Sequence, residues 1–206
     1  MPTPEDAPTA ALVQKILPEM LKIAGEEGWN AMTLQKAAQL ADVQADDVSQ
    51  ALPSGIDSLV PLYFRELDER LRDKLSNTDM GSLRIRDKVT LGVETWFELL
   101  GEHHGASVKA IDWCSARLFG RLPTTELIWG TADTIWTGIG DEDTGFTYMS
   151  KRTTLSAVLT STLAVWRQNA NDDAEWKAFL SRRIDDVMSF EKFKAKLKAP
   201  KFPFFA

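Results

Sequence analysis

The sequence has little of the chemistry on which most catalytic and metal sites depend. It holds one cysteine, Cys114, and two histidines, the adjacent His103 and His104. One cysteine excludes an intrachain disulfide, and we expect Cys114 to be a small buried side chain rather than a reactive thiol. Adjacent residues point to different sides of a helix, so we expect the histidines at a solvated helix end rather than as a ligand pair.

The sequence also lacks any run of about 18 apolar residues, the length that a membrane-spanning helix needs. Its N-terminal segment, MPTPEDAPTAAL, carries acidic side chains and no arginine, unlike a secretory signal or a transit peptide. From these two absences we expect a chain that is neither exported nor inserted in a bilayer.

The glycine-rich and acidic segment that follows residue 137 fits neither of the two sites that it suggests. Gly138 and Gly140 could begin a phosphate loop, but the acidic residues 141–143 follow at once and would repel a phosphate. As a calcium loop the segment has Arg152 at its twelfth position instead of a bidentate glutamate. No catalytic triad or nucleotide motif is found elsewhere. The sequence therefore predicts a protein that is not an enzyme, with no catalytic residue, no metal and no cofactor.

The two ends of the chain differ in charge. The net charge is −6, yet residues 189–206 hold five lysines and a single acid, Glu191. Phenylalanines alternate with these lysines, and Phe190, Phe193 and Leu197 fall on one face of a helix. Such a segment suits an anionic bilayer surface, although its apolar face could instead pack back on the protein. The acidic remainder of the chain is poorly suited to a polyanion.

Apolar residues recur with helical spacing along nearly the whole chain, which predicts an all-α fold of about nine or ten helices. We expect a kink or a restart at Pro18 in the first helix, because proline removes a donor and clashes with the preceding turn. Thr33 is expected to cap the second helix. The helices are predicted near residues 12–27, 34–40, 46–52, 59–75, 85–100, 108–119, 124–139, 153–166 and 176–187.

The first 55 residues are typical of a helix-turn-helix head, with two short helices behind a longer one. DNA binding needs cations that neutralise phosphates, but this segment holds eight acidic and three basic side chains. Asp46 and Asp47 stand at the start of the would-be recognition helix, which has no arginine, lysine or aromatic residue to reach a base. We therefore expect a degenerate head that binds no nucleic acid; the alternative is a ligand-responsive repressor.

Seven tryptophans and one uncharged segment remain to be explained. Trp96, Trp129, Trp136 and Trp166 fall on or beside apolar stripes, and they could fill the core or line a cavity for a long apolar ligand. Residues 153–166 hold no charge, so this helix must be covered by neighbouring helices, by a dimer partner or by bound lipid. Composition alone does not separate these alternatives.

The chain resembles an accessory family of ubiquinone biosynthesis whose eukaryotic member is the ninth Coq protein. The resemblance is carried by the segment IWTGIGDEDTGFTYMSKR, by TLSAVLTSTLAVW after it, and by FLSRRIDDVMSFEKFK, and it extends from Gly28-Trp29 to the basic C-terminal segment. It implies a TetR-like bundle that binds isoprenoid quinone intermediates, docks on membranes and presents its lipid to the di-iron demethoxyubiquinone hydroxylase. It also implies a non-catalytic protein.

The resemblance, together with the apolar stripes, gives the expected site residues. The side chains expected to bind the isoprenoid lipid are Trp96, Trp129, Ile135, Trp136, Phe146, Met149, Leu155 and Leu159. Those expected to contact the hydroxylase are Trp136, Tyr148, Met149 and Arg152. This chain departs from the family at Gly145, where aspartate is frequent, and at Tyr148-Met149, where an aromatic residue followed by tyrosine is common.

Three regions are therefore expected within one compact unit: a degenerate head at 1–55, a helical lipid-binding bundle at 56–188 and a membrane-docking tail at 189–206. Docking on an anionic surface is assigned to Phe190, Phe193, Lys194, Leu197 and Lys198. We expect a homodimer that is cytoplasmic and peripherally associated with the inner membrane. A scaffold that uses residues 153–166 only as a dimer interface is a further alternative.

Overall fold

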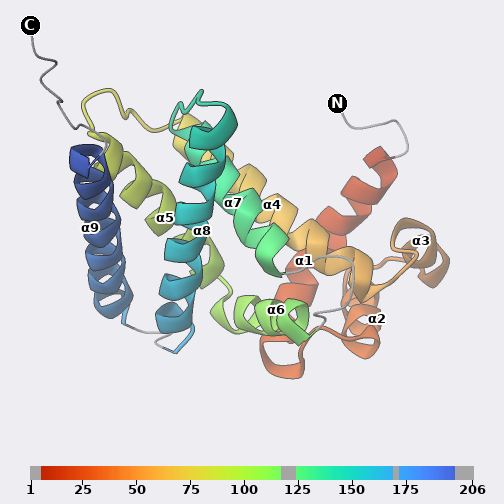
Figure 1. The fold of residues 1–206 in the computed structure, drawn as a ribbon. Coiled ribbons are helices and arrows are strands. Elements are labelled where there is room, and N and C mark those ends of the chain that lie inside the picture. Colours follow the sequence, from red (N-terminus) through yellow and green to blue (C-terminus); the bar gives the residue numbers. More distant parts are fainter. Residues whose placement is uncertain (1–5, 117–123, 169–171, 198–206) are drawn as a thin grey trace, which may run out of the picture.

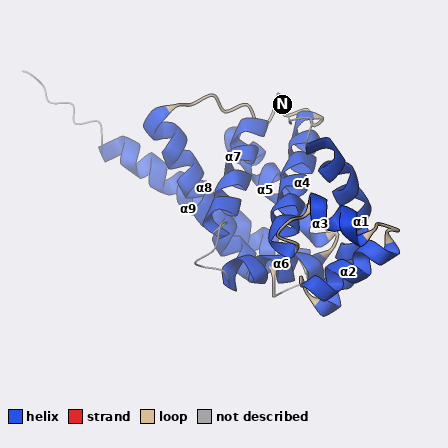
Figure 2. Cartoon of the chain, turned by 90° about the vertical axis from the view of Figure 1, so that its right-hand side faces the viewer, coloured by secondary structure: helices blue, strands red, loops and turns tan. Residues whose placement is uncertain are grey.

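The computed structural model describes residues 6–116, 124–168 and 172–197, and within them the chain forms nine α-helices and no strand (Figures 1 and 2). This confirms the all-α prediction and is consistent with a TetR-like bundle. The helices are α1 (Asp6–Glu27), α2 (Ala31–Leu40), α3 (Ala45–Ala51), α4 (Ile56–Ser76), α5 (Ile85–Gly101), α6 (His104–Ala116), α7 (Thr124–Gly138), α8 (Gly145–Trp166) and α9 (Asp173–Leu197).

The head departs from two local predictions. Of the kink or restart expected at Pro18, the restart does not occur, since α1 is one continuous helix in which Pro18 lies on the exposed side. Thr33 is not the cap of α2. The cap is Asn30, whose side chain accepts hydrogen bonds from the backbone of Met32 and Thr33, while the Thr33 hydroxyl accepts one from the Asn30 backbone in return. A capping box of this kind satisfies donors at both positions, which allows the helix to begin three residues earlier than expected.

The head packs on α6 and α4. Gly105 at the start of α6 lies so close to α1 that an added Cβ would stand 3.2 Å from the Cα of Gly25. Nearby, the Trp29 indole donates to the Ala106 carbonyl at 2.9 Å, and the hydroxyls of Tyr63 and Ser107 share a buried hydrogen bond of 2.7 Å. The small residues permit the close approach, and the hydrogen bonds fix its register.

The other helices form a bundle around α5, α7 and α8, and one buried cluster extends from Val13 of α1 to Ile184 of α9. Helix α4 packs on both α5 and α7, while α9 packs on α5 and α8. Glycines permit the close approach of α5 to α7 and of α4 to α7. A Cβ at Gly92 would lie 2.7 Å from Cγ2 of Ile135, and one at Gly138 would lie 2.8 Å from Cδ1 of Leu75.

The uncharged stretch of α8, residues 153–166, belongs to a helix that is covered within the chain by α7 and α9 (Figure 1). Its residues Leu155, Leu159 and Leu163 are buried, whereas its exposed positions from Thr153 onward are small or polar. Burial between neighbouring helices thus explains the lack of charge, and a dimer interface is not needed for it. No helix in the described residues is long and apolar enough to cross a membrane.

Candidate functional site

An apolar pocket of about 470 Å³ opens between α5, α8 and α9, beside Trp136 of α7. Its floor and walls come from four helices that start or end at the same end of the bundle (Figure 1). Its lining consists of Ile85, Arg86, Val89, Trp136, Phe146, Thr147, Ser150, Lys151, Thr154, Leu155, Val158, Ile184, Val187 and Met188. A cavity of this size with mostly apolar walls and few polar groups is typical of sites for small apolar ligands.

The mouth of the pocket exposes apolar side chains. Phe146 is 81% exposed and Ile85 is 47% exposed, although both also line the cavity. Met149 is 51% exposed on the next turn of α8. When large apolar side chains gather on an exposed surface, that surface commonly contacts a protein partner or a membrane.

The two cations in the lining are both paired with acids. The Arg86 guanidinium is bonded to Asp185 across the α5–α9 contact at 2.7 Å. Lys151 forms ion pairs with Asp141 and with Asp143, the latter at 2.5 Å, and its ammonium group lies 4.8 Å from the centre of the Trp136 ring. These pairs leave the pocket without an unopposed charge, which favours a neutral ligand over an ionic one.

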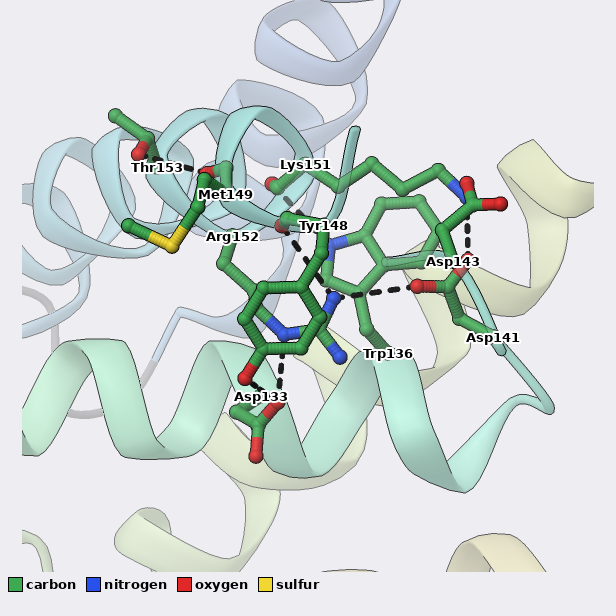
Figure 3. A network of polar contacts seen from close by, with 9 residues as sticks. All are labelled: Asp133, Trp136, Asp141, Asp143, Tyr148, Met149, Lys151, Arg152 and Thr153. Atoms are coloured by element: carbon green, nitrogen blue, oxygen red, sulfur yellow. Dashed lines mark hydrogen bonds and ion pairs between the residues drawn. The ribbon is translucent and has the colours of Figure 1, made fainter. Parts of the chain in front are cut away.

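A network of polar contacts around Arg152 joins α7 to the first two turns of α8 (Figure 3). The Arg152 side chain is 2% exposed, and it donates to Asp133 at 2.5 Å and to Asp141 at 3.2 Å. The Tyr148 ring lies 3.5 Å from the guanidinium carbon, and its hydroxyl donates to the same Asp133 at 3.0 Å. The buried cation is therefore fully paired, as a charge in such a position must be.

Ion pairing in this network shifts the pKa values of Asp141 and Lys151. Burial disfavours the charge on Asp141, but hydrogen bonds from Lys151 and Arg152 outweigh it and hold the pKa of Asp141 below its ordinary value. Burial likewise opposes the charge on Lys151, and its bonds to Asp141 and Asp143 nevertheless raise the Lys151 pKa. Both shifts favour the charged forms of Asp141 and Lys151, as expected for a structural ion pair.

The structure brings together only some of the residues expected to bind lipid. Trp136, Phe146 and Leu155 line the pocket. Met149 lies outside the lining on the exposed side of α8, and Trp129 is half-buried on α7. Trp96, Ile135 and Leu159 are buried in the core without lining the pocket.

The residues expected to contact a partner divide into an internal and an external pair. Arg152 is buried in the network, and Tyr148 is half-buried over it. Met149 is exposed, and Trp136 is half-buried with its indole donating to the Lys151 carbonyl at 3.2 Å. Met149 is the most exposed of the four and Arg152 is buried, so partner binding through this patch stays a prediction.

The membrane-docking residues lie at the end of the described chain. Helix α9 runs to Leu197, so the expected tail boundary at residue 189 falls inside this helix. The side chains of Phe190, Phe193, Lys194 and Leu197, and the whole of Lys198, lie outside the described residues. The structure also describes the cysteine and the two histidines. Cys114 is buried, His103 is exposed, and His104 lies half-buried against Trp166.

Sequence reasoning missed the α5 and α9 walls of the pocket. Ile85, Val89, Ile184 and Val187 lie on stripes that the sequence identified as core-facing. Periodicity reports which face of a helix avoids water, but it does not report whether a neighbouring helix fills the space opposite that face. The Arg86–Asp185 ion pair joins these two walls, but it links residues distant in the chain, which no pattern in the sequence indicates.

Two comparisons show which known proteins this chain is similar to. Residues 123–191 match the COQ9 family model. Over 200 residues the chain is 24% identical to a Xenopus tropicalis protein, the mitochondrial ubiquinone biosynthesis protein COQ9. This match covers 86% of the chain and 58% of the relative, so the chain spans little more than half of that protein. Both matches name COQ9, so the chain is similar to this family over residues 123–191 and, at lower identity, over most of its length.

Proposed function

We propose that this chain is a non-catalytic accessory protein of ubiquinone biosynthesis that holds an isoprenoid quinone intermediate in the pocket between α5, α8 and α9. The observation that carries the proposal is the position of that pocket. All of its lining residues except Ile85, Arg86 and Val89 fall within the segment that matches the COQ9 model. The fold and the family assignment thus point to the same part of the molecule.

The lining suits a neutral, mostly apolar ligand. Val89, Leu155, Val158 and Ile184 provide aliphatic surface, and burying apolar ligand surface there is favourable by about 25 cal/mol per Å². The hydroxyls of residues 147, 150 and 154 give the few polar contacts that orient a ligand without a charge. An isoprenoid tail with a small polar ring has both properties.

The second part of the proposal is delivery of the lipid at a membrane. Exposed Phe146 lines the pocket, exposed Met149 lies on the next turn of α8, and the C-terminal end of α9 lies at the same end of the molecule (Figure 1). We propose that the basic aromatic tail docks this end on an anionic bilayer, and that the mouth then faces the lipid and the di-iron demethoxyubiquinone hydroxylase. We also propose that the protein acts as a homodimer.

Blocking the pocket tests the first part. Thr154 is a half-buried lining residue, and the variant Thr154→Trp fills the cavity from its wall. We expect gently purified wild-type protein to carry isoprenoid lipid in native mass spectrometry. The variant should lose most of this lipid, because its indole takes the place of the ligand.

The adjacent position gives the matched control. Thr153 is exposed and outside the lining, so Thr153→Trp adds the same side chain without entering the pocket, and it should retain the lipid. Equal lipid content in both variants, or wild-type protein that is always lipid-free, would contradict the proposed function.

A further inference from the structure

The pocket between α5, α8 and α9 is polar near its mouth and apolar at its inner end. Its buried lining residues are all aliphatic: Val89, Leu155, Val158 and Ile184. Every lining side chain that carries a hydroxyl or a charge is at least partly exposed. The wall therefore offers hydrogen bonds to one end of a ligand and apolar contact to the other.

The hydroxyls of the lining form a row along one face of α8. The row consists of Thr147, Ser150 and Thr154, whose spacing of three and four positions places them on the same side of the helix. Thr147 is exposed, whereas Ser150 and Thr154 are half-buried. Four positions further on, the same face presents the buried Val158. This face of α8 thus changes from hydroxyl to aliphatic as the helix runs inward.

The hydroxyls of this row are free to bind a ligand. Elsewhere on α8, the hydroxyls of Thr153 and Thr160 each donate to the carbonyl four positions earlier, at 2.8 Å. Among the described residues, no side chain or carbonyl is hydrogen-bonded to any of the three hydroxyls in the row. A hydroxyl both donates and accepts, so each can pair with a ring carbonyl as well as with a ring hydroxyl.

We infer that Ser150 and Thr154 bind the oxygen-bearing ring of the ligand, which therefore enters the pocket tail first. In this orientation the ring oxygens meet the hydroxyl row, and the first part of the tail lies against Val89, Val158 and Ile184. The opposite orientation would bury the ring oxygens against aliphatic side chains that offer no hydrogen bond, which costs free energy.

The same orientation leaves the ring close to the mouth. Thr147 and Phe146, at the start of α8, are exposed there, so a docked enzyme can reach the ring while the tail stays in the pocket. The inference rests on the proposed function, because it takes the pocket as the binding site. It adds the direction in which the ligand enters and the two side chains that select an uncharged, oxygenated ring.

Two probes with the same tail test the role of the hydroxyls. One is a trimethylated decylbenzoquinone, whose fully substituted ring does not alkylate Cys114; the other is the decylbenzene with the same methyl groups and no oxygen. We expect wild-type protein to bind both probes in calorimetry. Ser150→Ala and the nearly isosteric Thr154→Val should each weaken quinone binding about fivefold, the size of one neutral hydrogen bond, and should not weaken hydrocarbon binding.

The adjacent threonine gives the control. Thr153 lies outside the lining and its hydroxyl is already bonded to the Met149 carbonyl, so Thr153→Val should change the affinity for neither probe.

A second measurement shows the orientation directly. The quinone is prepared with a photoreactive diazirine either at the end of its decyl tail or on its ring, and the labelled residues are identified by mass spectrometry. The tail probe should label the inner end of the pocket, at Val89, Val158 or Ile184, and the ring probe should label Phe146 or Thr147 at the mouth.

The inferred orientation would be overturned, with the pocket and the proposed function left standing, if the two labelling patterns were exchanged. The same conclusion would follow if both variants bound the quinone as wild type does, or lost the two probes equally. Wild-type protein that binds neither probe would overturn the proposed function as well. Because Ser150→Ala removes only a hydroxyl, the test remains decisive even if Thr154→Val does not fold.

Discussion

Asp68 shows how a single residue can make stability depend on pH. This carboxyl group lies half-buried between α4 and α7, where it accepts a hydrogen bond of 3.0 Å from the Thr131 hydroxyl. Burial raises the pKa of Asp68 to about 6, although the Thr131 bond and the charge of Arg72 act in the opposite direction. The charged form is thus less favourable in the folded chain than in the unfolded one.

The raised pKa predicts that folding stability falls as the pH rises. The folded chain holds this proton more tightly than the unfolded chain does. The contribution of Asp68 to stability is therefore complete below pH 3.8, the ordinary pKa of an aspartate, and is lost as the pH rises through about 6. After allowance for partial exposure the loss is about 2 kcal/mol.

We therefore expect Asp68→Asn to be more stable than wild type at pH 8 and about equal to it at pH 4, as measured by urea unfolding. The Asn side chain still accepts from Thr131 and carries no charge. Asp73→Asn, on the exposed face of the same helix, is the control and should have little effect at either pH. An Asp68→Asn variant that is less stable than wild type at pH 8 would contradict the sign of the effect.

At the scale of elements, the contact of α7 with α8 depends on charges as well as on apolar packing. Arg152 stands where its guanidinium meets Asp133 of α7 and Asp141 of the connecting turn (Figure 3). The same segment carries Phe146 into the pocket mouth and Thr154 into its wall. The network therefore fixes the part of α8 on which the proposed ligand site depends.

Removal of the buried cation should loosen this contact. Arg152→Met fills similar space but leaves Asp141, whose side chain is 5% exposed, without one of its partners. We expect a loss of about 3–5 kcal/mol in the free energy of unfolding, the usual cost of breaking a buried pair from one side. Urea unfolding at neutral pH measures it.

The exposed pair of Arg167 and Asp112 gives the comparison. Its side chains are 37% and 50% exposed, so Arg167→Met should cost less than about 1 kcal/mol. Similar losses in the two variants would show that the Arg152 network contributes no more than a surface ion pair.

At the scale of the whole molecule, charge separates two ends with different surfaces. The head presents Asp46 and Asp47 in the first turn of α3, a helix without a buried residue. At the other end, α9 leads into the lysine-rich segment. The sign of the charge thus disfavours phosphates at the head and favours an anionic bilayer at the tail.

We expect the wild-type chain to float with anionic vesicles, to float less with neutral ones, and to lose binding at high salt. The double variant Phe193→Asp/Leu197→Asp should reduce flotation strongly. Met32→Asp is the control: Met32 is 67% exposed on α2, and its change should leave flotation intact. Selective retardation of a DNA fragment at moderate salt, together with no affinity for vesicles, would instead favour a repressor.

The sequence by itself determined the all-α fold. The spacing of apolar residues shows that each segment is helical and which of its faces is buried, and this spacing is a property of the segment alone. The stripe of Leu59, Tyr63, Leu67, Leu71 and Leu75 became the buried face of α4. The sequence did not identify the cap of α2, where Asn30 takes the place expected for Thr33, and it did not show that α1 would continue through Pro18.

Only the tertiary structure decided which apolar faces meet and which leave a space between them. It buried Trp96 and Leu159, left Phe146 at a pocket mouth, and placed Arg152 inside a charged network instead of on the surface. A sequence records the polarity of each position, but a cavity and an ion pair depend on residues distant in the chain. Their positions follow from how closely helices pack, as at Gly92 against Ile135.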